Sequence, residues 1–86
     1  MEYIVVAFRS RTHTVKFADF LRSFMINCEI VNTPKEAGVG CGLSVKIPPA
    51  LFPQVKRAIR NINLNSYAGC FFVRVTQNGK TVRNAF

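Results

Sequence analysis

An uncharged run of β-branched and aromatic residues lies near the start of the sequence and reads Tyr3-Ile4-Val5-Val6-Ala7-Phe8. Such side chains favour extended backbone, and a run that is apolar at successive positions is typical of a strand buried on both faces. The polar residues 9–12 that follow it introduce a turn. We therefore predict a buried first strand and place the remaining elements around it.

A helix is predicted after this turn, from about Thr12 to Ile26. Ser10 or Thr12 can cap its N-terminus, because a hydroxyl oxygen accepts hydrogen bonds from the first free amides. The apolar side chains that recur at helical spacing are Phe17, Leu21, Phe24, Met25 and Cys28, and those on the opposite side are Lys16, Asp19 and Ser23. The pattern predicts an amphipathic helix packed on the first strand.

The next segment predicts two strands joined by a loop. Residues 28–32 form a short second strand that ends at Thr33-Pro34, because proline cannot continue a sheet ladder. Residues 35–42 form the loop. The third strand, residues 43–47, alternates, so that Leu43, Val45 and Ile47 face the core while Ser44 and Lys46 face away.

The second half of the chain predicts one more helix and a hairpin. An apolar stripe runs from Leu51 to Ile62, with Pro53 in the first helical turn. Residues 69–76 are strongly strand-forming, and Asn78-Gly79 is a signal for a type I′ turn. Residues 80–83 can then add a weak fifth strand.

These elements follow one another in βαββαβ order, which predicts an α+β fold of the ferredoxin-like type. Right-handed crossovers make that order a four-stranded antiparallel sheet of strand order 4-1-3-2, with both helices on one face and a possible C-terminal hairpin strand. Residues 1–86 should form a single domain, because no linker or repeat divides the chain.

The composition describes a basic protein with an ordinary hydrophobic core. Twelve Lys and Arg oppose four Asp and Glu, giving a net charge of +8, and 49% of the residues are hydrophobic. The N-terminus lacks the features of a secretory signal, so we expect a soluble protein of the reducing cytoplasm. Three cysteines without a C-x-x-C pair predict neither a disulfide framework nor a metal site, and no cofactor is indicated.

Cys41 is the candidate reactive residue. In the predicted fold, the loop that carries it lies beside the N-terminus of the first helix, and positive side chains and helix N-termini favour the nucleophilic thiolate. The neighbouring glycines permit tight backbone curvature and leave amides free to hold an anion. The residues expected around the thiol are Arg9, Arg11, Thr12, His13, Lys35, Glu36, Gly40 and Gly42.

Plainer interpretations of these residues remain open. Cys41 could be an ordinary small residue at the start of a strand, and His13 could simply be exposed in the first turn of a helix. We expect Cys28 to pack at the opposite end of the molecule. The first strand should separate Cys70 from Cys41 by about 9–10 Å, two strand spacings, so a disulfide between them is not expected.

Two short motifs resemble a known family. The segment Thr33-Pro34-Lys35-Glu36, followed by Cys41-Gly42-Leu43, is similar in order and spacing to small bacterial selenium/sulfur carrier-like proteins. Phe8-Arg9-Ser10, Thr12-His13 and Tyr67-Ala68-Gly69 also match, so the resemblance covers about residues 3–76. It implies that Cys41 carries sulfur or selenium as a persulfide or selenopersulfide. The glycines before Cys41, the basic charge and the tail after residue 76 look like departures from the family.

The leading functional hypothesis is therefore a thiol-based carrier or accessory protein, rather than an enzyme that turns over alone. Its partners would be a sulfur or selenium donor protein and an acceptor protein, with no membrane. A nucleic-acid-binding module is a less favoured alternative, because only Tyr3 and Phe72 are expected to offer stacking surfaces on the sheet. A protein-interaction domain is a third, with Tyr3, Val5 and Phe72 forming an open sheet face suited to a homodimer.

Overall fold

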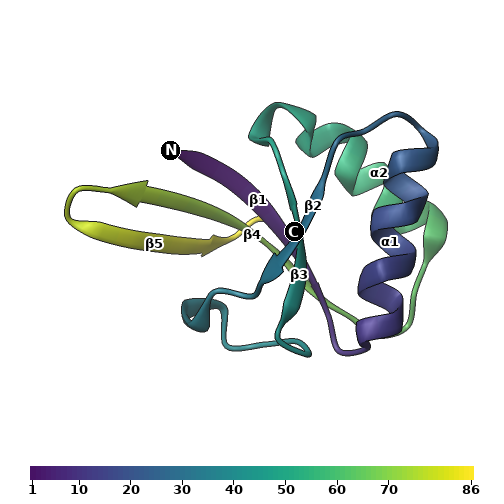
Figure 1. Cartoon of the computed structure of the whole chain (residues 1–86), viewed down its shortest axis with the longest axis horizontal. Coiled ribbons are helices and arrows are strands. Elements are labelled where there is room, and N and C mark those ends of the chain that lie inside the picture. The colour runs from purple at the N-terminus through teal and green to yellow at the C-terminus, as the bar shows by residue number, and fades with distance from the viewer.

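The fold is built on one five-stranded antiparallel sheet with two helices. The computed structural model describes all residues, 1–86. The elements are β1 (Glu2–Phe8), α1 (Arg11–Ser23), β2 (Glu29–Asn32), η1 (Lys35–Ala37), β3 (Leu43–Ile47), η2 (Pro49–Leu51), α2 (Phe52–Ile62), β4 (Tyr67–Thr76) and β5 (Gly79–Asn84). The strand order is β2-β3-β1-β4-β5, and every neighbouring pair is antiparallel (Figure 1). The order 4-1-3-2 predicted from the sequence is present within this sheet, but the expected four strands are five.

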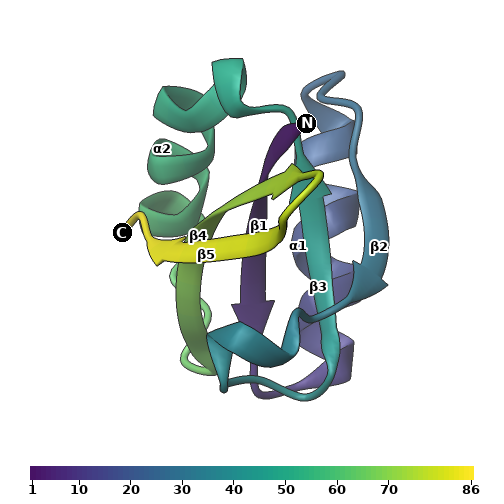
Figure 2. The same cartoon turned by 90° about the vertical axis from the view of Figure 1, so that its left-hand side faces the viewer.

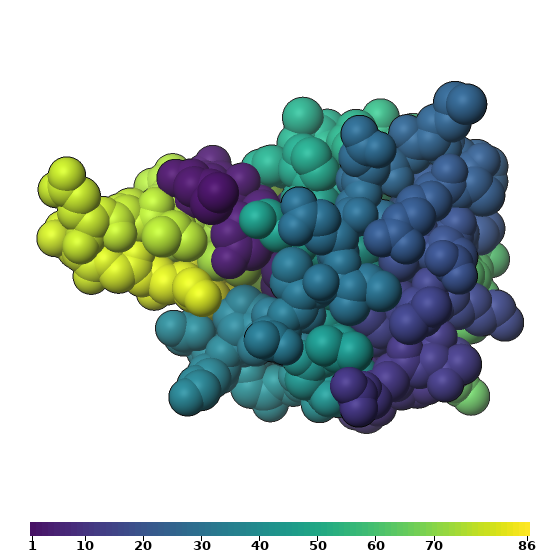
Figure 3. All heavy atoms as spheres, viewed as in Figure 1, coloured from purple at the N-terminus to yellow at the C-terminus, as the bar shows by residue number.

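The two helices lie on one face of the sheet, as the element order predicts. Figure 1 shows α1 and α2 side by side on the right, while the β4–β5 hairpin extends away from them on the left. In the space-filling view of Figure 3 this hairpin forms the narrow end of a molecule that measures 36 × 24 × 19 Å, with the first residues of the chain beside it. Neither helix is long and apolar enough to cross a membrane.

β1 is the centre of the hydrophobic core. The side chains from Ile4 to Phe8 are between 0% and 1% exposed. Ile4, Val6 and Phe8 belong to the cluster beneath the helices, whereas Val5 and Ala7 belong to a second cluster on the other face. The uncharged run therefore reflects burial on both sides, as the sequence predicts.

The helix-side cluster is filled from α1, α2 and three strands. The fully or nearly buried side chains that the two helices contribute are Phe17, Ala18, Leu21, Val55, Ala58 and Ile59. The ring of Phe17 packs against Phe8 with centroids 5.2 Å apart. This packing fixes α1 over the end of β1.

The second cluster shows that the predicted open face is wrong in two respects. Val5 is fully buried, because Ala37, Val39 and Val82 from the η1 loop and β5 pack over this face (Figure 2). Phe72 lies on the helix side, because the register pairs it with Ile4, and its ring packs 5.0 Å from that of Phe52. The surface on which a sheet-face homodimer was predicted is therefore largely covered.

α1 ends at Ser23, three residues before the predicted end. Met25 has a left-handed backbone with φ 61°, and the amides of Met25 and Ile26 donate to the carbonyls of Arg22 and Leu21. This is the Schellman arrangement that terminates helices. Phe24 and Met25 are consequently 63% and 95% exposed, so their predicted place on the buried stripe is wrong.

β5 is a full strand that pairs with β4 from Phe71↔Asn84 to Thr76↔Gly79. The turn residues are Gln77 and Asn78, and neither has a positive φ. Gly79 follows them with φ 126°, so the turn lies one position earlier than predicted and is not of type I′. A glycine after such a turn absorbs the backbone twist that a primed turn would otherwise supply.

Truncating a core side chain of α1 tests this packing. We expect Leu21→Ala to lower the free energy of unfolding by about 2–5 kcal/mol, because it leaves a cavity in a site with no exposure. The control is Val15→Ala on the same helix, where the side chain is 44% exposed and the expected change is within about 0.5 kcal/mol. Urea denaturation of both variants measures the difference, and equal losses would contradict this placement of α1.

Candidate functional site

The glycine-rich loop Gly38–Gly42 closes over the end of β1. Gly38, Gly40 and Gly42 have φ of 67°, 92° and 95°, in the left-handed region that side chains disfavour. A Cβ on Gly40 would lie 3.2 Å from the carbonyl oxygen of Phe8. The amide of Cys41 donates to that same oxygen at 2.9 Å. The loop backbone is thus held directly against the last residue of β1.

The side chain of Cys41 is half-buried and faces polar atoms. Its Sγ lies 3.7 Å from the hydroxyl of Thr14 and 3.7 Å from the carbonyl oxygen of Leu43. Thr14 is fully buried, and its hydroxyl also lies 3.4 Å from the Leu43 oxygen and 3.3 Å from that of Ser10. As a thiol, Cys41 can donate to Leu43. As a thiolate, it can accept from Thr14, because a hydroxyl rotates to suit its neighbours.

Thr14 belongs to the first turns of α1, so the thiol lies beside the positive end of this helix. Ser10 is the N-cap, and its hydroxyl oxygen accepts from the amide of His13 at 3.2 Å. The first turn contains no acidic residue, so no carboxylate offsets the partial positive charge of the free amides. The predicted position of Cys41 next to this N-terminus is therefore found, with Thr14 as the contact.

Two of the predicted neighbours are engaged elsewhere. His13 Nδ1 is 2.5 Å from the hydroxyl of Ser66 in the α2–β4 connection. Arg9 donates from its backbone amide to Ser66 at 2.7 Å and from its guanidinium to the Tyr67 carbonyl at 3.4 Å. Neither forms a hydrogen bond with Cys41. These contacts fasten the β1–α1 turn to the start of β4.

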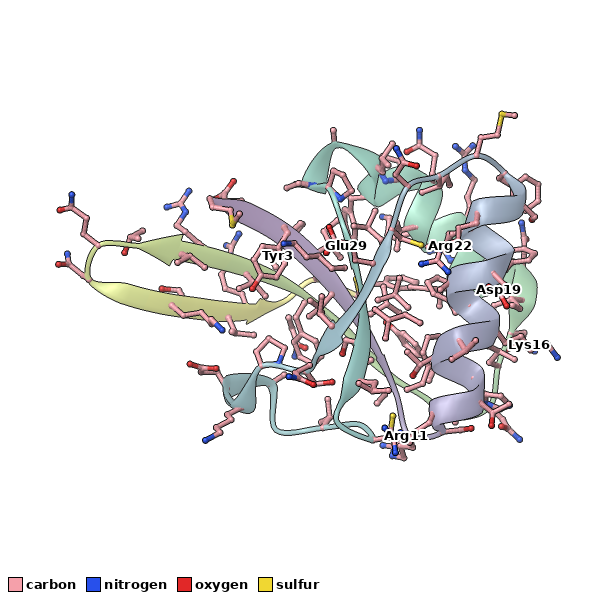
Figure 4. All side chains as sticks on the ribbon, viewed as in Figure 1. Tyr3, Arg11, Lys16, Asp19, Arg22 and Glu29 are labelled. Atoms are coloured by element: carbon pink, nitrogen blue, oxygen red, sulfur yellow. The ribbon has the colours of Figure 1, made fainter.

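Arg11 and Thr12 are exposed at the start of α1 and form no side-chain hydrogen bond or ion pair. Figure 4 shows Arg11 at the end of the molecule where α1 begins, apart from Lys16 and Arg22 further along the helix. Arg11 therefore remains a free cation at the end of the helix that carries Thr14.

The other predicted residues gather around a shallow basin on the loop. Its lining comprises Arg9, Thr33, Pro34, Lys35, Gly38, Val39, Gly40 and Gly42. The amides of Val39, Gly40 and Gly42 have no acceptor within the protein. Glu36 is exposed in η1 and does not line the basin. The residues predicted to surround the thiol therefore fall into two groups. One group lies on the side of the loop that faces the Cys41 thiol, and the other lines a basin that contains positively charged side chains and amides without an acceptor.

The two remaining thiols lie in different environments. Cys28 is at the opposite end of α1, where burial raises its pKa more than the nearby Arg22 guanidinium lowers it. Cys70 is fully buried, and burial raises its pKa to about 12. Val6 of β1 pairs with Cys70 on one side and Val45 on the other, so β1 separates Cys70 from β3 as predicted.

Sequence reasoning missed Thr14 and Ser66. Thr14 stands three residues before Phe17 and continues the buried stripe of α1. A polar residue at a position of that stripe was the sequence signal that could have identified Thr14 as a contact of the thiol. Ser66 gave no such signal, because its contact with His13 joins residues 53 apart in the sequence.

Comparison with protein families is consistent with the motifs around this loop. Residues 2–68 match the family described as "Putative Se/S carrier protein-like". The chain belongs to this family. The family match includes Cys28 and Cys41 but ends before Cys70 and the β5 strand. No significant match was found among curated proteins or among solved structures.

Two glycine substitutions test the fit of the loop on β1. Gly40→Ala should lower the free energy of unfolding by about 1–3 kcal/mol, because the new Cβ meets a backbone oxygen at a strained φ. Gly42→Ala has a similar φ but open space around it, so it should cost less. Urea denaturation compares them, and equal costs would show that the close approach to Phe8 is unimportant.

The buried Cys70 predicts a pH dependence of stability. Its pKa rises from 9.0 to about 12, so between these values the folded state binds more protons than the unfolded state. Stability should therefore be intact below about pH 9 and fall as pH rises further. Cys70→Ala should flatten the curve between about pH 9 and pH 11. The buried Tyr67, whose pKa is also raised, contributes in the same direction and remains in the variant. If stability fell with pH as steeply in Cys70→Ala as in the unaltered protein, Cys70 would not be a source of this pH dependence.

Proposed function

We propose that the protein carries a sulfur or selenium atom on Cys41 and passes it to an acceptor protein. Membership of the family supports the class of cargo, and the structure of the loop supports the choice of residue. The proposal also includes a ferredoxin-like sandwich extended by β5, which the strand order and the two helices on one face support.

The observation that carries the proposal is the difference between the three thiols. Cys41 is half-buried against a hydroxyl at the N-terminal end of a helix, where a thiolate or persulfide anion gains a hydrogen bond and a favourable dipole. Burial raises the pKa of both other thiols, and Cys70 is in addition fully enclosed. Because the thiolate is the attacking form, Cys41 is the best placed of the three.

The loading step is a transpersulfidation. The Cys41 thiolate attacks the outer sulfur of a persulfide on a donor protein, so a new S–S bond forms on Cys41 as the donor's S–S bond breaks. The donor leaves as a thiolate that takes up a proton, and the number of electrons is conserved. A selenium atom follows the same course from a donor selenopersulfide. Transfer onward is the reverse exchange, with a thiolate of the acceptor attacking the outer atom.

The residues around the loop have distinct roles in this scheme. Thr14 donates its hydroxyl to the anionic sulfur, and Arg11 together with Thr12 presents the open end of α1 to the incoming group. Arg9 and Lys35 line the adjoining basin with the amides of Gly40 and Gly42, where an acidic group of the partner protein can be held. His13 plays a supporting part by fastening the turn to Ser66, and no contact in the structure gives Glu36 a role.

Cysteine reactivity tests the choice of residue. Iodoacetamide should alkylate Cys41 of the folded protein at least about tenfold faster than Cys28 or Cys70, because burial raises the pKa of both of those thiols and Cys70 is fully enclosed. Incubation with glutathione persulfide should add one sulfur atom to Cys41, detected by peptide mass spectrometry. Thr14→Val should slow both reactions, since it keeps the shape of the side chain but removes the hydroxyl.

The controls are Cys41→Ser, which should abolish the sulfur adduct, and Cys28→Ser, which should leave it unchanged. Thermal melting of each variant establishes that the folds are comparable. Alkylation of Cys41 no faster than of Cys28, or an adduct that survives Cys41→Ser, would refute the carrier role of this residue.

A further inference from the structure

Six side chains lie on the face of the sheet opposite the η1 loop and contact one another in series. Four of these contacts join a cation to an aromatic ring, and one joins two rings. We call this series the aromatic–cation row, and in order of contact it consists of Arg60, Phe86, Lys56, Phe52, Phe72 and Arg83. The cation-to-ring distances lie between 5.1 and 5.9 Å, and the two central rings are 5.0 Å apart. The row joins α2 to β4, β5 and the last residue of the chain.

The segment that supplies the row has only positively charged side chains, and Glu2, which lines a pocket with Phe72 and Arg83, is paired with Arg74. Residues 37–86 contain seven Lys and Arg and no Asp or Glu. The two ion pairs of the protein use Asp19 and Glu2, and neither involves a cation of the row. No Asp or Glu side chain therefore forms an ion pair with Lys56, Arg60 or Arg83.

The row is open to solvent and held in place. Phe86 is 43% exposed, and Phe52 and Phe72 are half-buried. The carbonyl of Phe86 accepts from the hydroxyl of Tyr67 at 3.1 Å, and its amide donates to Cys70. Figure 2 shows the end of the chain beside α2, at the edge of the sheet where β5 lies. Contacts with the rings restrict the long basic side chains, which reduces the entropy lost when they bind a ligand.

We propose that the aromatic–cation row binds single-stranded nucleic acid. Bases stack on exposed aromatic rings irrespective of sequence, while phosphates pair with adjacent Lys and Arg side chains. The row supplies both kinds of group on one surface, with every ring in contact with at least one cation. An acidic protein would use the charges but would not need planar rings beside them, so the combination favours a polymer that carries bases and phosphates together.

The site is independent of the sulfur chemistry. Its members lie on α2, β4, β5 and the segment after β5, whereas Cys41 lies in the loop between η1 and β3. Phe72, Arg83 and Phe86 also fall outside the residues matched by the family model. The stacking surface predicted from the sequence, with Tyr3 and Phe72 on the same face, does not form, because Phe72 faces the helix side of the sheet. The stacking surface proposed here is the aromatic–cation row instead.

Fluorescence anisotropy with labelled single-stranded RNA and DNA of mixed sequence tests the proposal on the full chain. Arg60→Gln/Arg83→Gln should weaken binding at least about tenfold and reduce the slope of log K against log salt by about 1.4, since each phosphate contact contributes about 0.7. Phe86→Ala should weaken binding about fivefold or more without changing that slope, because it removes stacking and no charge.

The matched control is Lys16→Gln/Arg22→Gln, which removes two positive charges from α1 on another surface (Figure 4). It should affect binding much less than the row variant, and Cys41→Ser should bind like the unaltered protein. Binding of either RNA or DNA in this pattern supports the proposal, and the difference between them identifies the preferred sugar. No binding at low salt, equal losses in both charge variants, or displacement by polyglutamate with no effect of Phe86→Ala would overturn it.

Discussion

The burial of β1 on both faces is the constraint on which the structure depends. Five successive side chains, Ile4 to Phe8, are out of contact with water, so each face of the strand needs a cover. The helices cover one face, and the η1 loop with β5 covers the other. A fully buried aliphatic or aromatic side chain contributes roughly 1.5–3 kcal/mol, so losing either cover would cost much of the stability of so small a chain.

This constraint also positions the loop that carries Cys41. The loop must approach β1 closely enough to cover it, which only a glycine permits at position 40. Positive φ values alternate with Val39 and Cys41 along the loop, and these two side chains lie on opposite faces of the sheet. Val39 joins the second cluster, and Cys41 meets Thr14 on the helix side. The packing of an apolar neighbour therefore sets the orientation of the thiol.

Hydrophobic periodicity was sufficient to predict most elements, and right-handed crossovers then gave the strand order and the place of Cys41 beside α1. The failures arise where periodicity does not determine the backbone conformation, the register or a remote contact. Met25 continues a helical pattern, yet the chain adopts a left-handed backbone there and α1 stops. Phe72 was assigned to the wrong face because its side depends on register with Ile4, which a continuous apolar run does not fix. His13 could not be placed because Ser66 is remote in sequence.

β1 links the Cys41 loop to the basic surface through one rigid element. Its Phe8 carbonyl binds the amide of Cys41, while Ile4 pairs with Phe72 of the aromatic–cation row. Four residues of extended strand separate these two points, about 13 Å along the sheet. Because β1 is fully buried and paired on both edges, the separation is fixed by the most stable part of the molecule rather than by a hinge. A polymer held on the row would therefore stand at a constant position relative to the thiol, so the two proposed activities would need no conformational change to act on one complex.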